Sequence, residues 1–242
     1  MGDQPANTIG LSPRVIWGEL IRVARNTNIS NSQQNLVFLV PDDQLQTVCE
    51  LAAYHHLYPA DTHTLRPVYP SEFADGALRY LIDDSPGWSP DTGLPRRRLV
   101  FVPLSWTGIT RCELIPILAK ASWEPTLPCT VWTVPLPATC AAYVGIITRE
   151  KHGSPIRFRL LEGLSSVVGY SFFDMSYEGD YMEIPLDDEL SDKEILEIEN
   201  AEKEMNGWVL RDDQEWIRQT LIQMATGKKH YDDLPCQEDT KM

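Results

Sequence analysis

Residues 36–56, LVFLVPDDQLQTVCELAAYHH, carry the local pattern that decides the fold. The run LVFLV is apolar at every position and rich in β-branched and aromatic side chains, which predicts a buried strand. Pro41 and the two aspartates after it end this strand and favour the start of a helix. Apolar residues then recur at helical spacing, at Leu45, Val48, Cys49 and Ala52. The stretch therefore predicts a strand followed by a helix.

Similar patterns recur along the chain. The segments RLVFVPL at 98–104 and TVWTV at 130–134 predict two further buried strands. Segments rich in proline predict loops at 57–70 and 83–95. Helical spacing or a capping signal predicts helices at 12–25, 72–81, 110–120, 137–147, 156–173, 191–205 and 212–224.

We therefore expect an α+β (mixed α/β) protein with a small central sheet flanked by helices and a C-terminal helical part. The expected division is a mixed core over 1–173 and an acidic helical part over 174–242 that packs on the core. Charge supports this division, because the chain has a net charge of −14 and residues 174–242 hold 20 acidic but only 7 basic residues.

The composition disfavours two classes of partner. An acidic surface repels phosphate groups, so we expect no nucleic acid, and we interpret Arg96, Arg97 and Arg98 as a solvated strand entry. No apolar run approaches the roughly 20 residues that span a bilayer, so we expect no membrane association. The start MGDQPANTIG lacks the basic residues and the apolar stretch of a secretory signal peptide, so we expect a cytoplasmic location. The oligomeric state stays open.

The five cysteines are odd in number, form no C-x-x-C pair and match no zinc spacing. We interpret them as buried, reduced thiols, with one alternative. Cys140 falls near the start of a predicted helix, where a thiolate is favoured, so it is the candidate if a thiol is catalytic. No nucleotide or cofactor motif is present, and we expect neither a cofactor nor a metal.

Tryptophans and tyrosines supply the other candidate side chains. Trp17, Trp106 and Trp132 are candidates to line an apolar pocket, although packing in the core is the alternative. Trp106 follows Ser105 at the end of a predicted strand, where open α/β sheets often bind ligands. Ser105 itself lacks the glycine elbow of a nucleophile.

The segment 172–189 combines Tyr177 and Tyr181 with several carboxylates, which suits either acid–base chemistry or a solvated turn. Arg149 and His152 are further candidate hydrogen-bond donors.

Five segments together resemble a group of uncharacterised fungal proteins with a nucleotidyltransferase-like fold. They are VIWGEL (15–20), LVFLVPDDQL (36–45), RRLVFVPLSWTGI (97–109), TVWTVPLPATCAAYV (130–144) and VVGYSFFDMSYEGDYME (167–183). The resemblance covers residues 12–225 and implies a nucleotidyltransferase-like core. Active members of that superfamily have a Gly-Ser turn, two aspartates one residue apart on the next strand, and a third carboxylate on a later strand. These acids hold two metal ions.

This chain departs from that pattern at each position. The turn is Trp17-Gly18-Glu19 without a serine, the strand at 35–38 has no aspartate, and the later strand at 99–102 has no acid. The resemblance therefore implies a pseudoenzyme, a scaffold without metal or nucleotidyl transfer. It also places Glu19 at a turn that faces the cleft, which makes Glu19 a candidate catalytic acid.

Two functions follow as expectations. The first is a catalytically vacated scaffold that binds an apolar small molecule or a protein partner. The alternative is a cofactor-independent cyclase, isomerase or hydrolase that acts on an apolar metabolite in fungal specialised (secondary) metabolism. For the enzyme, the candidate catalytic residues are Glu19, Tyr177, Arg149 and His152. The candidate binding residues are Trp17, Trp106, Trp132 and Tyr181.

Overall fold

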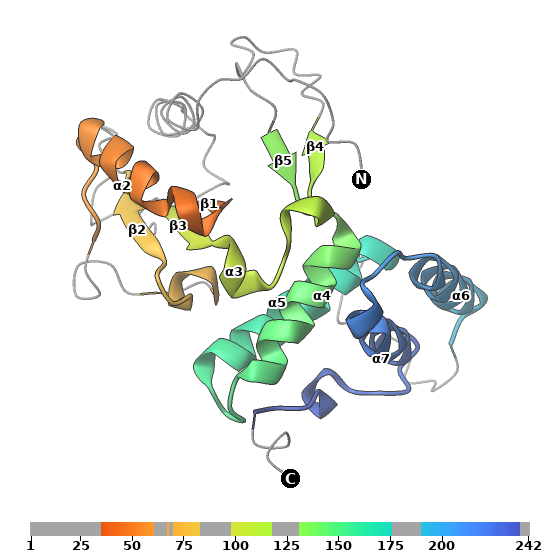
Figure 1. Ribbon diagram of the computed structural model, residues 1–242. Helices are drawn as coiled ribbons and strands as arrows, with labels where there is room; N and C mark the ends of the chain where they lie inside the picture. The colour runs from red at the N-terminus through yellow and green to blue at the C-terminus, as the bar shows by residue number, and fades with distance from the viewer. Residues whose placement is uncertain are drawn as a thin grey trace. The chain divides into compact units, whose positions relative to one another are not determined.

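The structure is a computed structural model, and it describes residues 35–60, 67, 70–82, 98–117, 131–175 and 190–237. The chain divides into two compact units. We call Met1–Trp106 with Ile115–Thr133 the sheet unit, and Thr107–Leu114 with Val134–Met242 the helical unit. The described elements are mixed α+β with a small mixed sheet, which confirms the expected class at this level (Figure 1).

Three strands of the sheet unit pair in the order β1-β3-β2. β1 (Asn35–Val40) is parallel to β3 (Arg98–Pro103), and β2 (Leu78–Leu81) is antiparallel to β3. β3 is the central strand and is buried at all of its positions. Its continuous apolar sequence is the pattern expected of a strand covered on both faces.

Side chains of β3 alternate between two hydrophobic clusters, because successive residues of a strand point to opposite faces. Leu99 and Phe101 belong to a cluster with Val48 and Ala52 of α2 (Leu45–Tyr54), which follows the short η1 (Asp42–Gln44). Val100 and Val102 belong to a second cluster with Ala74. The predicted strand and helix at 36–56 are thus confirmed and form half of the first cluster.

A buried ion pair joins the entry of β3 to η2 (Pro70–Phe73). Nη1 of Arg98 lies 2.7 Å from both carboxylate oxygens of Glu72, and the two side chains are 8% and 0% exposed. The expectation of a solvated strand entry is therefore wrong for Arg98. The guanidinium is buried because a carboxylate from an earlier turn of the chain neutralises it.

Two predicted helices are absent from the described structure. The segment 72–81 holds η2, a turn at Gly76 with φ +75, and then β2. The segment 110–117 holds η4 (Arg111–Glu113) and β4 (Ile115–Ile117), and β4 pairs with β5 (Val131–Thr133). In both cases pairing with a distant strand prevails over local helical spacing. α3 itself is a single turn, Leu104–Thr107.

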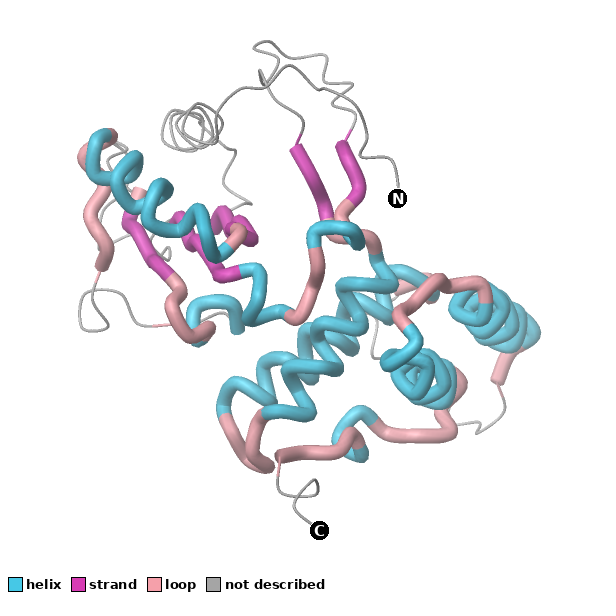
Figure 2. The backbone as a smooth tube through the Cα atoms, in the orientation of Figure 1, coloured by secondary structure: helices cyan, strands magenta, loops and turns pink. Residues whose placement is uncertain are grey.

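The described part of the helical unit contains no paired strand (Figure 2). α4 (Leu136–Arg149) and α5 (Pro155–Phe172) lie side by side, joined by a short turn. α6 (Asp192–Asn206), η5 (Asp212–Gln214), α7 (Glu215–Ala225) and η6 (Tyr231–Asp233) follow. Strand 130–134 and the helices predicted at 137–147, 156–173, 191–205 and 212–224 are confirmed as elements, and Ser191 and Glu194 form the expected capping box.

Of the acidic C-terminal helices, α6 packs on α5, and α6 and α7 pack on each other. The rings of Phe172 and Trp208 lie 6.0 Å apart, and Nζ of Lys193 lies 2.5 Å from Asp174. In the structure α4 and α5 group with these helices, so the compact units divide near residue 134, whereas the sequence analysis divides the chain after residue 173.

Arg157 fixes the C-terminal segment to the α4–α5 pair. It is 3% exposed, and its guanidinium donates to the carbonyl oxygens of Ile147 at 2.8 Å, Leu234 at 2.6 Å and Pro235 at 3.0 Å. Buried carbonyl groups need a donor, and the fork of an arginine supplies several at once. These hydrogen bonds provide donors for backbone carbonyl groups both near the end of α4 and in the C-terminal segment.

The helix predicted at 12–25 and the loop predicted at 83–95 lie outside the described residues. Within the described ranges, no helix combines the length and the apolar content that crossing a membrane requires.

The ion pair of the sheet unit generates a stability prediction. Glu72→Gln removes the carboxylate that lies against the buried charge of Arg98, so we expect the free energy of unfolding to fall by about 3 kcal/mol. Urea denaturation followed by circular dichroism measures this change. The control is Glu162→Gln, which removes an exposed pair with Arg159 and is expected to change stability by less than about 0.5 kcal/mol. Equal, small effects of both substitutions would contradict the prediction.

Candidate ligand-binding site

A pocket of ≈ 220 Å³ lies within the helical unit. Three stretches of chain form it: the segment 107–113, one face of α4, and the start of α7 with η5. Its lining residues are Thr107, Gly108, Ile109, Glu113, Ala138, Ala141, Ala142, Gly145, Arg149, Arg211, Asp213, Gln214, Trp216 and Ile217. The pocket combines a floor of small apolar residues with a wall of charged ones.

The floor comes from the helical spacing of α4. Ala141 and Ala142 are each three or four residues from both Ala138 and Gly145, so the four residues lie on one face of the helix. At Gly145 an added Cβ would meet no heavy atom within 4 Å, so the space above this backbone is open. Glycine inside a helix is less favourable than alanine by roughly 0.5–1 kcal/mol. No close neighbour in the described structure explains this glycine.

Gly163 on α5 shows the contrasting situation. A Cβ there would lie 2.7 Å from Cε1 of Tyr143, so Gly163 allows α4 and α5 to approach closely. One helical glycine thus serves packing between helices, whereas the other faces an open pocket.

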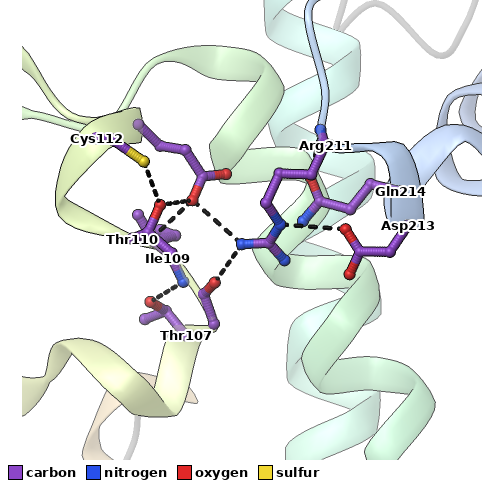
Figure 3. A network of polar contacts seen from close by, with 9 residues as sticks. Thr107, Ile109, Thr110, Cys112, Arg211, Asp213 and Gln214 are labelled. Carbon is purple, nitrogen blue, oxygen red and sulfur yellow. Dashed lines mark hydrogen bonds and ion pairs between the residues drawn. The ribbon is translucent and has the colours of Figure 1, made fainter. Parts of the chain in front are cut away.

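The charged wall is organised around Arg211 (Figure 3). Its Nη1 donates to the carbonyl oxygen of Gly108 at 2.8 Å and to Oε2 of Glu113 at 3.2 Å, and its Nε donates to Oδ1 of Asp213 at 3.3 Å. Its backbone N–H donates to Oε1 of the buried Gln214 at 3.3 Å. These bonds hold the side chain across the gap between the segment 107–113 and the start of α7.

Glu113 is fixed in turn by the segment that carries it. Its Oε2 accepts hydrogen bonds from the backbone N–H of Thr110 at 2.7 Å and from the Thr110 hydroxyl at 2.5 Å. The carboxylate is therefore positioned before any ligand arrives.

The wall has two charges of each sign, from Arg149 and Arg211 and from Glu113 and Asp213. Guanidinium groups keep their charge at any physiological pH, so they bind and orient anionic groups rather than transfer protons. Trp216 adds an aromatic surface that is 42% exposed. The arrangement suits a small molecule with both polar and apolar parts.

The structure describes four of the eight site residues chosen from the sequence. Arg149 lines the pocket at the end of α4. His152 is exposed in the turn after α4, outside the pocket lining. In the sheet unit, Trp106 packs beside Val100 and Val102, and Trp132 on β5 is 54% exposed.

The other four site residues lie outside the described residues. They are Glu19, Tyr177, Trp17 and Tyr181.

Cys140 is buried, as the main interpretation of the cysteines expects, and this burial disfavours the alternative of a catalytic thiol. It is the fifth residue of α4 and is 0% exposed, and burial raises the pKa of its thiol to about 12. A helix N-terminus favours a thiolate only when the thiol reaches solvent or a polar partner, and here apolar surroundings dominate. Burial also raises the pKa of Tyr143 and, to about 12, that of Tyr231, and both lie near Cys140.

Ser105 is the second residue of the short helix α3. Its backbone N–H and hydroxyl donate to the two carboxylate oxygens of Asp42 at 3.1 and 2.5 Å. The hydroxyl hydrogen bond is the main reason that the pKa of Asp42 lies below its ordinary value. Residues 104–107 thus form a single helical turn directly after β3.

Sequence reasoning missed Arg211, Glu113, Asp213, Trp216 and Gly145. One signal was available, because a glycine in the middle of a helical pattern calls for a packing or functional reason. Arg211 and Glu113 are 98 residues apart, so no local pattern joins them. In the described ranges no group of three or more His, Cys, Asp or Glu residues could hold a metal ion.

Comparisons with protein-family models, with curated proteins and with solved structures found no match for this chain.

The different surroundings of Gly145 and Gly163 predict opposite changes in stability when each is replaced by alanine. Gly145→Ala is expected to raise the free energy of unfolding by about 0.5–1 kcal/mol, because the methyl group enters open space and alanine favours the helix. Gly163→Ala is expected to lower it by about 1–2 kcal/mol, because the methyl group overlaps the ring of Tyr143. Urea denaturation measures both. Destabilisation by Gly145→Ala would mean that the space above α4 is filled.

The different exposure of Cys112 and Cys140 predicts which of the two thiols a reagent modifies in the folded protein. Iodoacetamide at about pH 8 is expected to alkylate the exposed Cys112 and to leave Cys140 unmodified until urea unfolds the protein, because the buried thiol stays protonated. Peptide mapping by mass spectrometry distinguishes the two sites. Rapid labelling of Cys140 in the folded protein would contradict its burial.

Proposed function

We propose that this protein binds a small organic molecule in the pocket of the helical unit and acts as a binding protein. Of the two kinds of partner that the sequence leaves open, the pocket favours the small molecule. The observation that carries this proposal is the open space above Gly145, in a pocket whose lining also contains the ion-paired Arg211.

The lining of the pocket supports a ligand with both apolar and charged groups. The floor of α4 offers methyl groups and bare backbone, whereas the wall offers two guanidinium and two carboxylate groups. Ligand sites commonly combine an apolar surface for contact with a few placed polar groups for orientation. The proposed ligand is thus amphipathic rather than purely apolar.

The proposal includes a vacated nucleotidyltransferase-like scaffold for the sheet unit. Its support is the resemblance of the quoted segments, together with the composition of the strands. β1 (NLVFLV) and β3 (RLVFVP) contain no aspartate or glutamate, the residues that hold metal ions in active members of that superfamily. On this proposal the protein binds its ligand without transferring a nucleotide.

A thermal-shift screen of small metabolites tests the proposal. A ligand at 100 times its Kd adds about 2.7 kcal/mol to the stability of the folded state, which corresponds to a rise in Tm of roughly 5–10 °C for a chain of this size. We expect such a rise for the native protein and for Gly145→Ala. Gly145→Leu is expected to abolish it, because the larger side chain fills the pocket.

Three outcomes would contradict the proposal. A ligand that stabilises Gly145→Leu as much as the native protein binds somewhere else. A shift of several degrees with ATP and Mg²⁺ would favour nucleotidyl transfer. Conversion of a bound ligand into a product, followed by NMR, would favour the cofactor-independent enzyme that the sequence leaves as the alternative.

A further inference from the structure

We infer that the ligand of this pocket is a free α-amino acid with an apolar side chain. The inference rests on the binding function proposed above and specifies the chemical class of the ligand. Three features of the pocket lead to it: an open guanidinium donor, an open carboxylate acceptor, and a small apolar floor.

The open donor belongs to Arg211. Its Nη1 and Nε are occupied by Gly108, Glu113 and Asp213, whereas no residue in the described structure accepts a hydrogen bond from its Nη2. Arginine binds carboxylates through such N–H groups, and here the side chain is already held in place. Nη2 is therefore placed to donate to a ligand carboxylate, and Arg149 adds a second positive charge to the same lining.

The open acceptor belongs to Glu113. All three of its hydrogen bonds, from the N–H and hydroxyl of Thr110 and from Arg211, reach Oε2. Oε1 accepts none from the residues that the structure describes. A carboxylate has about four lone-pair sites on its two oxygens, so Oε1 is able to accept from a ligand ammonium group.

The charge of the lining favours a zwitterion over a simple anion. Two guanidinium groups and two carboxylates give the pocket no net charge. A ligand with only a carboxylate would be attracted to Arg211 but repelled by Glu113 and Asp213. A ligand with an ammonium and a carboxylate on one carbon meets a complementary group with each charge.

The size of the pocket and its floor define the rest of the ligand. A volume of ≈ 220 Å³ is below the roughly 300–1,000 Å³ of pockets for drug-sized ligands, so the pocket suits a single amino acid rather than a long peptide. Ala141, Ala142 and Gly145 leave room above α4, and Trp216 offers an exposed ring. An apolar side chain is able to pack between them.

Isothermal titration calorimetry with matched ligands tests this inference. The apolar standard amino acids, including L-phenylalanine and L-leucine, are titrated into the native protein. Hydrocinnamate lacks the ammonium group of phenylalanine, and phenethylamine lacks its carboxylate. We expect L-phenylalanine or L-leucine to bind. For phenylalanine, loss of either charged group is expected to weaken binding about tenfold or more, because each makes a charge-assisted hydrogen bond.

Glu113→Gln separates recognition of the ammonium group from a general structural effect. We expect this variant to bind the amino acid about tenfold more weakly and hydrocinnamate no more weakly than the native protein does. An equal loss for both ligands, or a variant with a collapsed Tm that binds neither, would overturn the role of Glu113 if the control Glu162→Gln, at an exposed residue outside the pocket, still binds both. Gly145→Leu is expected to prevent binding of either ligand.

The outcomes separate this inference from the proposed function. Hydrocinnamate that binds as tightly as L-phenylalanine, or failure of every apolar amino acid to bind, would overturn the amino-acid inference. The proposed function still stands in those cases if the metabolite screen finds another ligand that Gly145→Leu excludes. The proposed function itself fails when the metabolite screen finds no ligand that binds the native protein and that Gly145→Leu excludes.

Discussion

Buried backbone groups must have hydrogen-bond partners, and in this chain arginine side chains meet that constraint where irregular segments pack on helices. Arg157 donates to three carbonyl groups and holds the C-terminal segment on α4 and α5. Arg211 makes a more exposed contact of the same kind, because it donates to the carbonyl of Gly108 and holds the segment 107–113 near the start of α7. An arginine reaches several acceptors from one side chain, so each of these contacts organises two or more pieces of chain.

Much of the fold was predictable because local pattern and tertiary environment agree. Each residue of β3 is apolar or paired, and the strand is buried on both faces. The capping box at Ser191 begins α6 at the predicted residue. The predictions failed at 72–81 and 110–120, where β2 and β4 form by pairing with distant strands. Helical spacing in a short segment carries no information about such partners, and a turn at Gly76 is compatible with either structure.

The site was less predictable than the fold for a related reason. Arg149 was chosen as a hydrogen-bond donor, but the pocket also needs residues from two distant segments, 107–113 and 211–217. Asp212 and Asp213 were recognised only as a helix start, although Asp213 also accepts a hydrogen bond from Arg211. Arg98 was interpreted as solvated because its partner Glu72 lies 26 residues away and in a segment predicted to be helical. Charged residues define their roles through tertiary partners, which hydrophobic periodicity does not reveal.

The ion pairs that Arg211 makes with Glu113 and Asp213 affect which ligands the pocket binds. An arginine held by Glu113 and Asp213 has already lost much of its rotamer freedom, so a ligand that binds it pays less ordering entropy than at a mobile arginine. The same carboxylates reduce the attraction of Arg211 for a simple anion, because they neutralise its field. Such a wall gains selectivity at the expense of raw affinity for anions. Its best ligand is one whose own charges are balanced and spaced like those of the wall, which is the property that a zwitterion has and a free carboxylate lacks.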